Sequence, residues 1–193
     1  MTLPKIILGS TSPRRKEILS YFKLPFEQAS PNFDEESVPQ ISDPEKYAIL
    51  IARGKLDSLL PNDALVISAD TVVFKDGKYF AKPKDMQEAL SFLKELQGKE
   101  HAVISGICVH YQGKTLEGYE KTNVLFNSLD DEKILDYLNR IEWKDKAGGY
   151  GIQESGALLI NKIEGCFYNV MGFPINTLKD FLHQFGINLW KFL

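Results

Sequence analysis

The chain contains few cysteines and no long hydrophobic run. Only two cysteines, Cys108 and Cys166, occur among 193 residues; they lie far apart and share no metal-binding spacing. The apolar stretches are too short to cross a bilayer. The first residues lead directly into a predicted strand and lack the pattern of a signal peptide. These absences argue against a disulfide framework, a zinc site and a membrane protein, and we expect a cytoplasmic location.

The chain also lacks an excess of basic residues. It has 23 Lys and Arg against 26 Asp and Glu, which gives a formal net charge of −3. Nucleic-acid-binding domains carry a basic stripe or patch, so we expect no nucleic-acid partner. The hydrophobic fraction of 44% is typical of a soluble protein with a sizeable core. Any phosphate binding must therefore come from a local group of basic side chains.

Such a group occurs near the N-terminus. An apolar run at residues 6–8 predicts a strand, Gly9 and three hydroxyl residues predict a turn, and Pro13 suits the first position of a helix. Arg14 and Arg15 then occupy the first helical turn, where the helix dipole disfavours cations unless an anion is bound. With Ser10 in the turn, free N–H groups and two guanidiniums indicate a polyphosphate site. An ordinary strand–helix junction with two solvated arginines is the alternative.

Strands and helices alternate along the whole chain. We expect strands at 5–9, 64–68, 71–74, 79–81 and 157–163, and helices at 13–22, 43–60, 85–96, 130–141 and 174–185. Two strands flank a turn at 112–114 and indicate an antiparallel hairpin. This order predicts one α/β domain over residues 1–193 with a mixed sheet, and a second lobe at about residues 88–140.

Asp70 stands between two apolar strand segments. Aspartate is depleted inside strands, so one interpretation is a turn or capping residue between two short strands. The other is a carboxylate at the edge of the sheet that binds a divalent cation or takes a proton from water. The acidic run Asp34-Glu35-Glu36 offers a second carboxylate for such a cation, although acidic runs are usually only solvated.

Two lysines and a glycine-rich loop complete the candidates. Lys55 lies late in a predicted helix and by itself resembles a surface residue. Lys82 precedes a proline that favours an extended backbone, which could direct its ammonium group into a cleft. Residues 146–153 contain three glycines in four positions, and there Tyr150 could stack on a flat ring and Gln153 could hydrogen-bond to it. A plain glycine loop is the alternative.

In chain order, these segments resemble the Maf family of nucleoside triphosphate pyrophosphatases. The matching segments are Ser10-Thr11-Ser12-Pro13-Arg14-Arg15, Phe33-Asp34-Glu35, Ala52-Arg53-Gly54-Lys55, Ala69-Asp70-Thr71-Val72-Val73, Lys82-Pro83-Lys84-Asp85, Gln97-Gly98-Lys99-Glu100-His101, Gly148-Gly149-Tyr150-Gly151-Ile152-Gln153 and Asn169-Val170-Met171-Gly172-Phe173-Pro174. Each segment is unspecific alone, but together they run through nearly the whole chain.

The resemblance implies an elongated mixed sheet flanked by helices, with two lobes and a central cleft, like that of inosine triphosphate pyrophosphatases. It implies a homodimer that uses Mg²⁺ or Mn²⁺ and releases monophosphate and pyrophosphate from a nucleoside triphosphate. The roles it implies are catalytic for Asp70 (the proton acceptor), Lys55 and Lys82, phosphate-binding for Ser10, Arg14 and Arg15, and metal-binding for Glu35 and Asp70.

Within the family, the residues that follow the catalytic aspartate and end the glycine loop resemble the branch that acts on dTTP and UTP. These residues are Thr71 and Gln153, with Arg14 in the first motif, and they are the expected specificity residues. Modified pyrimidine nucleotides are further candidate substrates. The rival interpretation is a non-catalytic nucleotide-binding regulator of cell division and septum formation. Thr11 and Gly54 depart slightly from the family pattern, and neither change removes a chemical group.

Overall fold

The computed structural model describes residues 3–60 and 63–193. The strands are β1 (Ile6–Gly9), β2 (Glu27–Ala29), β3 (Leu65–Lys75), β4 (Lys78–Phe80), β5 (Glu100–Tyr111), β6 (Lys114–Phe126) and β7 (Ile160–Glu164). The helices are α1 (Pro13–Ser20), α2 (Pro44–Asp57), α3 (Met86–Leu96), α4 (Asp131–Leu138), α5 (Phe167–Val170) and α6 (Ile175–Gln184), with short 3₁₀ turns that include η1 (Glu35–Ser37) and η4 (Leu189–Phe192). No helix in these described ranges has the length and hydrophobicity that a membrane crossing requires.

Residue contacts divide the chain into two compact units. The first unit contains Met1–Asp70, Ser105–Glu120 and Gly172–Leu193, and the second contains Thr71–Ile104 and Lys121–Met171. Strands β3, β5 and β6 contribute residues to both units. The division assigns residues 105–120, which lie inside the expected second lobe, to the first unit.

The described strands form a seven-stranded mixed sheet in the order β2-β1-β3-β5-β6-β7, with β4 beside β3. Strand β1 runs parallel to both β2 and β3, whereas β4 and β7 run antiparallel to their neighbours β3 and β6. A two-residue turn at Gln112 and Gly113 joins β5 to β6, and both residues have positive φ, as a tight hairpin requires. The mixed sheet and the hairpin confirm the prediction.

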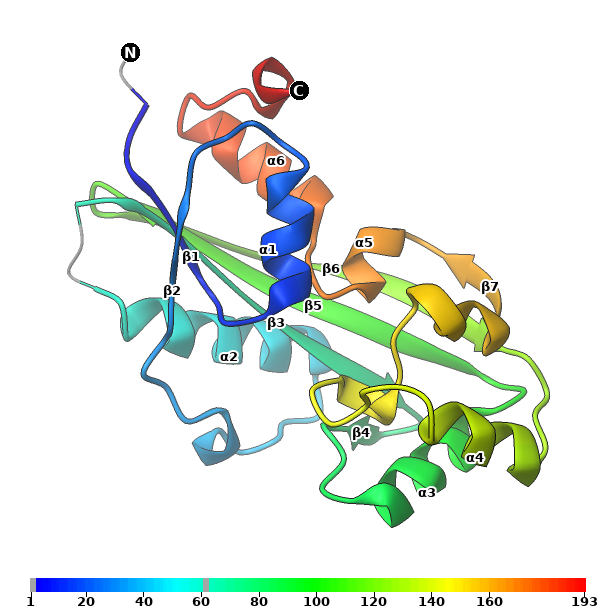
Figure 1. Ribbon diagram of the computed structural model, residues 1–193. Coiled ribbons are helices and arrows are strands. Elements are labelled where there is room, and N and C mark those ends of the chain that lie inside the picture. The colour runs from blue at the N-terminus through cyan, green and yellow to red at the C-terminus, as the bar shows by residue number, and fades with distance from the viewer. Residues whose placement is uncertain (1–2, 61–62) are drawn as a thin grey trace. The chain divides into compact units, whose positions relative to one another are not determined.

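In the first unit, helices α2 and α6 lie on opposite faces of the strands (Figure 1). Gly106 of β5 lies so close to α2 that an added Cβ would overlap the backbone of Ala48. Tyr111 of the same strand packs edge-on against Phe185, which directly follows α6, with ring centroids 6.1 Å apart. Because successive side chains of a strand point to opposite faces, the even and odd positions of β5 meet different helices.

The helix α2 starts as the sequence predicts. Asp43 accepts a hydrogen bond from the Lys46 N–H at 3.0 Å, and Pro44 occupies the first turn. Buried α2 side chains pack under the strands in an apolar cluster that includes Ile7, Ala52, Leu56, Ala64, Val66 and Cys108. The cluster confirms Cys108 as a core thiol, and burial raises its pKa to about 12. This packing fixes α2 against the strand that carries Asp70.

Strand β3 corrects one expectation, because it runs unbroken through Asp70 instead of splitting into two short strands. It also has neighbours on both sides, β1 and β5, so Asp70 is not on an edge strand of the sheet. The β-propensity scale spans only about 1 kcal/mol, so the pairing of the strand as a whole outweighs the poor propensity of one aspartate. The last residue pair between β1 and β3 is Gly9 with Ser68, so Asp70 lies two residues beyond it, at the carboxyl end of β1.

The second unit has its own apolar core. Helix α3 supplies the predicted stripe, and its Ala89, Phe92, Leu93 and Leu96 are all buried. Phe92 packs edge-on against Phe80 of β4 at a centroid distance of 5.3 Å. An ion pair of 2.7 Å between Lys94 and Asp131 joins α3 to α4. Each unit therefore buries a hydrophobic core of its own.

Candidate functional site

A buried lysine bridges two carboxylates in the first unit. The Lys55 ammonium lies 2.5 Å from Oδ1 of Asp70 and 2.8 Å from Oε1 of Glu35. The side chains of Lys55 and Asp70 are only 8% and 10% exposed, whereas that of Glu35 is 36% exposed. Water therefore screens the Lys55–Asp70 pair only weakly. Glu35 is the member of the three that is most exposed to solvent.

The strand alternation explains why Asp70 meets Lys55. Val66, Ser68 and Asp70 occupy alternate positions of β3 and share one face. Val66 belongs to the cluster that packs against α2, and the Ser68 hydroxyl donates a 2.7 Å hydrogen bond to the α2 carbonyl of Ala52. Asp70 therefore also faces α2, and Lys55, three residues after Ala52, reaches it.

The arginine of the first helical turn is buried instead of solvated. Arg15 is 8% exposed, its Nε donates to the carbonyl of Gly172 at 2.7 Å, and its Nη1 donates to Oγ of Ser10 at 3.4 Å. Ser12 caps α1 as predicted, since its hydroxyl accepts from the Arg15 N–H. Arg14 is half-buried. The turn thus holds Ser10 and both arginines at the start of α1.

Electrostatics link Arg15 to the two carboxylates. Burial lowers the pKa of Arg15, the charges of Asp70 and Glu35 oppose this effect, and Arg14 adds to it. Burial is also the main cause that raises the pKa of Tyr47, and the same two carboxylates raise it further. The sequence-predicted residues Ser10, Arg15, Glu35, Lys55 and Asp70 therefore form one group in this unit, and Tyr47 lies within its field.

Residues 33–38, called the acidic segment below, bring Glu35 to this group. Asp34 caps η1 by accepting from the Glu36 N–H at 3.0 Å. The Phe33 ring lies on Gly54 of α2 so closely that an added Cβ would come within 3 Å of three ring atoms. The Tyr47 hydroxyl donates to the carbonyl of Val38 at 3.4 Å. The segment is therefore ordered along α2 rather than a freely solvated acidic run.

Comparison with known proteins identifies the family. The model of the Maf-like protein family matches residues 5–185 of this chain. The chain belongs to the Maf family. Proteins of Chlamydia felis and Chlamydia caviae named dTTP/UTP pyrophosphatase are each 45% identical to it over 193 residues, which cover 98% of either chain. A protein of Clostridium kluyveri with the same name is 42% identical over 191 residues, which cover 96% of this chain and all of that one.

A solved structure gives a weaker similarity. It is a nucleoside-triphosphatase, or dITP/XTP pyrophosphatase, of Mycobacterium abscessus, with 15% identity and a TM-score of 0.40. The match covers 65% of this chain and 75% of that one. A similarity of this degree adds nothing to the description of the fold or the site.

Three more of the Maf motif residues belong to the second unit. Thr71 is half-buried and directly follows Asp70 in β3. Lys82 is exposed in the connection between β4 and α3, and Gln153 is half-buried at the start of a 3₁₀ turn. The Gly148 N–H donates to the carbonyl of Ala81 at 3.0 Å, so the glycine loop is fastened beside the Lys82 connection.

Tyr150 does not offer a ring for stacking on a base, as the sequence had suggested. It is 5% exposed, and its hydroxyl lies 2.6 Å from Nε2 of His101. The rings of His101 and Phe126 pack edge-on against it at centroid distances of 5.4 and 4.7 Å. This Maf motif tyrosine therefore anchors the glycine loop to the core of its unit.

The carboxylates of the first unit fit a divalent cation. In the described part of the chain no three His, Cys, Asp or Glu side chains gather into a metal site. Mg²⁺, however, is commonly held by one or two carboxylates together with substrate phosphates and water. Glu35 and Asp70 supply two such carboxylates, and both already contact one cationic group, the Lys55 ammonium.

Sequence reasoning missed the residues that hold the acidic segment. Tyr47 and the Phe33–Gly54 contact were not singled out, although Tyr47, Ile51 and Lys55 share one face of α2 at a spacing of four residues. That spacing was the sequence signal that could have pointed to Tyr47. Gly54 gave a weaker signal: its departure from the family pattern is visible in the sequence, but the sequence does not show that the Phe33 ring fills the space beside it.

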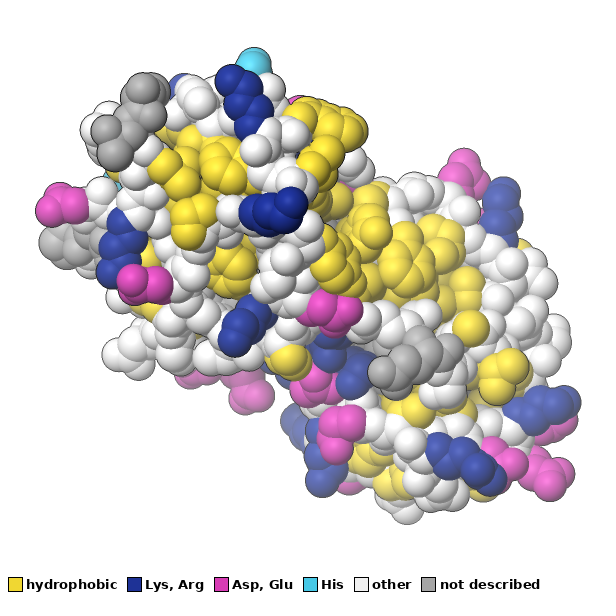
Figure 2. All heavy atoms as spheres, turned by 45° about the horizontal axis from the view of Figure 1, so that its top comes forward, with side chains coloured by type: hydrophobic (Ala, Val, Ile, Leu, Met, Phe, Trp, Pro, Cys, Tyr) yellow, Lys and Arg dark blue, Asp and Glu magenta, His cyan; other side chains and the backbone are white. Residues whose placement is uncertain are grey.

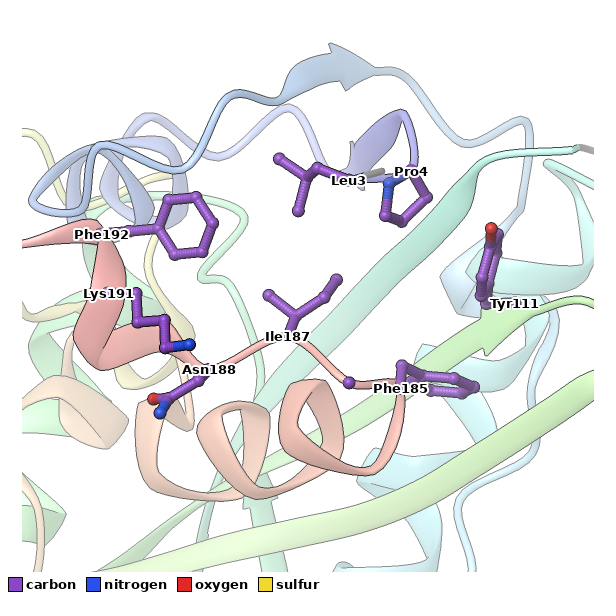
Figure 3. Close-up of a pocket in the computed structure, with 9 residues that line it drawn as sticks. Leu3, Pro4, Tyr111, Phe185, Ile187, Asn188, Lys191 and Phe192 are labelled. Atoms are coloured by element: carbon purple, nitrogen blue, oxygen red, sulfur yellow. The ribbon is translucent and has the colours of Figure 1, made fainter. Parts of the chain in front are cut away.

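A separate pocket of about 320 Å³ lies elsewhere in the first unit (Figure 3). Its labelled lining side chains come from the chain before β1, the end of β5 and the segment that follows α6: Leu3, Pro4, Tyr111, Phe185, Ile187, Asn188, Lys191 and Phe192. The residues around Lys55 that are described above (Ser10, Arg15, Glu35, Lys55 and Asp70) do not line this pocket. On the face drawn in Figure 2, basic and acidic side chains are interspersed.

Proposed function

We propose that this protein is a nucleoside triphosphate pyrophosphatase that hydrolyses dTTP and UTP to the monophosphate and pyrophosphate. The buried ion pair of Lys55 with Asp70, 2.5 Å long, carries the proposal. Burying a charged pair has a desolvation cost that apolar side chains avoid, so its presence at the carboxyl end of β1 is better explained by chemistry than by stability. The names and the full-length similarity of the curated relatives support the substrate assignment.

In this mechanism Asp70 is the general base. Its carboxylate accepts a proton from the water that attacks the phosphate chain, and the bond to the leaving pyrophosphate breaks. Lys55 contacts Asp70 and holds the carboxylate in place. Asp70 also qualifies as a metal ligand, and the two roles are compatible at one carboxylate.

Cationic side chains stabilise the charge that develops on the departing pyrophosphate. We assign this role to Arg14, Arg15, Lys55 and Lys82, with the Ser10 hydroxyl and the N-terminal amides of α1 as further donors. Arg15 is held by Gly172 and Ser10, so its guanidinium is preorganised before the substrate arrives. Preorganised donors need little rearrangement in the transition state.

Glu35 and Asp70 would hold a Mg²⁺ or Mn²⁺ ion together with phosphate oxygens of the substrate. When bound, the cation supplies positive charge that neutralises these oxygens. We also propose that Thr71, Gln153 and Arg14 select pyrimidine nucleotides, and that the protein acts as a homodimer, as the family resemblance implies.

The first experiment measures pyrophosphate release from dTTP, UTP, 5-methyl-UTP, CTP, GTP, ITP and 7-methyl-GTP with Mg²⁺ or Mn²⁺. Selective turnover of dTTP and UTP is expected. Turnover of purine nucleotides alone would keep the enzyme class and reject the proposed specificity residues. Binding of a nucleotide without turnover of any would favour the non-catalytic regulator.

Asp70→Asn tests the mechanism. Loss of the general base should lower kcat at least about 10³-fold, while nucleotide binding by calorimetry stays nearly unchanged. Asp131→Asn is the matched control, because Asp131 is an exposed carboxylate that pairs with Lys94. A near-normal kcat for Asp70→Asn would reject Asp70 as the base.

A further inference from the structure

The acidic segment is fastened to α2 at three points. Phe33 lies on Gly54, Glu35 pairs with Lys55 at 2.8 Å, and the Val38 carbonyl accepts from Tyr47. Phe33 and Val38 stand at the two ends of the segment, and Glu35 lies between them. The backbone on both sides of Glu35 is therefore held by contacts that are not themselves part of the charged group.

The helix supplies these three contacts from one face. Tyr47 and Gly54 are seven residues apart, which is close to two helical turns, and Tyr47 and Lys55 are eight residues apart, slightly more than two turns. The segment itself is short and has backbone hydrogen bonds of its own. The Ser37 N–H donates to the Asp34 carbonyl and the Val38 N–H donates to the Glu35 carbonyl, both at 3.3 Å. A shift at either end of so short a segment moves the Glu35 backbone.

We infer that Tyr47 and Gly54 are positioning residues that act through Val38 and Phe33 to set where the Glu35 carboxylate lies against Lys55 and Asp70. This inference rests on the proposed function for its kinetic tests. It adds two residues that have no chemistry of their own in the reaction. Gly54 is needed for the space that it leaves to the Phe33 ring, and Tyr47 for its hydroxyl group.

Of the two positioning residues, Gly54 should give the larger effect when it is replaced by alanine. An added methyl group would lie 2.2 Å from two atoms of the Phe33 ring. Carbon atoms pack at about 3.5 to 4 Å, so the ring must move by roughly 1.3 to 1.8 Å. A displacement of that size near a reacting group can lower the rate about 100-fold, so kcat/KM should fall by between about 10-fold and 100-fold. Alanine favours helix more than glycine does, so a purely local effect on α2 would stabilise the protein instead.

Phe33→Ala supplies the control for this substitution. Without the ring the three atoms nearest to the added methyl group are gone, so Gly54→Ala should cause almost no further loss in a Phe33→Ala background. An equal loss in both backgrounds would overturn the role of Gly54.

Tyr47→Phe keeps the ring and removes only the hydroxyl group. Loss of one hydrogen bond should raise KM for dTTP about threefold with kcat nearly unchanged. A merely destabilised enzyme would instead lose kcat in proportion to its unfolded fraction and keep its KM. The matched control is Tyr119→Phe, which removes the hydroxyl of a tyrosine that is 48% exposed, and it should leave both constants unchanged.

A double-mutant cycle decides whether Tyr47 acts through Glu35. In a Glu35→Gln background, Tyr47→Phe should have no further effect on KM, whereas independent effects would multiply. Full retention of the Tyr47→Phe effect in that background would overturn the inference.

Hydrogen exchange tests the positioning without any turnover. Peptides that contain the amides of Glu36, Ser37 and Val38 should exchange faster in Tyr47→Phe than in Tyr119→Phe. Unchanged exchange would overturn the inference even if the enzyme is active. Faster exchange in a protein that hydrolyses none of the nucleotides would support the positioning and reject the proposed function.

Discussion

The two units bury polar side chains in opposite ways. The first unit buries charge: Lys55 contacts Asp70 at 2.5 Å and Glu35 at 2.8 Å, and Arg15 lies within their field. The second unit buries a neutral pair, in which the His101 ring lies 2.6 Å from the Tyr150 hydroxyl. Burial is the main cause that lowers the pKa of His101 to about 4, so the ring is uncharged at neutral pH.

The difference separates the proposed reactive site from a structural anchor. A buried ion pair seldom adds stability over an apolar pair of equal volume, whereas a neutral hydrogen bond inside a core has a smaller desolvation cost. The charge buried in the first unit therefore fits the phosphate chemistry that we propose for it. The neutral pair of the second unit fastens the glycine loop without placing a charge in its core.

Among the tests of this contrast between the units, removing the central cation should give the largest loss of stability. Lys55→Met leaves Asp70 and Glu35 without their shared partner, and removing one member of a buried pair destabilises a protein by about 3 kcal/mol or more. Urea unfolding should show that loss, and kcat for dTTP should fall at least about 100-fold. Lys94→Met, which breaks only the exposed pair with Asp131, is the control. Unchanged stability and rate in Lys55→Met would remove the contrast between the units.

Acid should weaken the second unit through His101. Its pKa is about 4 in the folded protein against 6.5 ordinarily, so between these values the unfolded chain binds more protons than the folded one. The contribution of His101 to the free energy of unfolding is fully present above pH 6.5. The free energy of unfolding should fall by about 3 kcal/mol as the pH drops from 6.5 to 4.

Unfolding curves at several pH values measure this loss. His101→Asn should flatten the slope between pH 6.5 and 4 relative to the unsubstituted protein. His183→Gln, which changes an exposed histidine of the first unit, should leave the slope as it was. Identical slopes in the two variants would show that the buried histidine does not control acid stability.

Tyr150→Phe should give a moderate effect confined to stability. The substitution leaves Nε2 of His101 without its tyrosine partner, which should destabilise the protein by about 1 to 2 kcal/mol. Because Tyr150 is buried, anchors the loop and is not among the proposed catalytic residues, kcat should change little. A large loss of kcat at full stability would place Tyr150 among the residues that act on the substrate.

The smallest effect is expected at an exposed ion pair of the first unit. Arg53 pairs with Glu117, and both side chains are about 40% exposed. Glu117→Gln should change the free energy of unfolding by less than about 1 kcal/mol, since water screens such pairs. If Glu117→Gln lowered the free energy of unfolding as much as Lys55→Met does, burial would not explain why the Lys55–Asp70 pair matters more than the Arg53–Glu117 pair.

Most of the local structure was predictable from the sequence. The strand–turn–helix start, the Asp43 and Ser12 caps, the α3 stripe and the hairpin all rest on short-range preferences, and each is confirmed. The unbroken strand through Asp70 was not predicted, because its pairing depends on strands far away in the sequence. Tyr150 was misjudged for the same reason, since its partner His101 lies 49 residues earlier.

The sequence by itself determined the family, the elements and the residue types that can bind phosphate, because motifs and periodicity are local properties of the chain. Only the tertiary structure decided that Lys55 bridges Asp70 and Glu35, and that Phe33 fills the space over Gly54. Both arrangements depend on which faces of α2 and β3 meet. That meeting is set by packing between segments that are distant in the sequence, which no local pattern records.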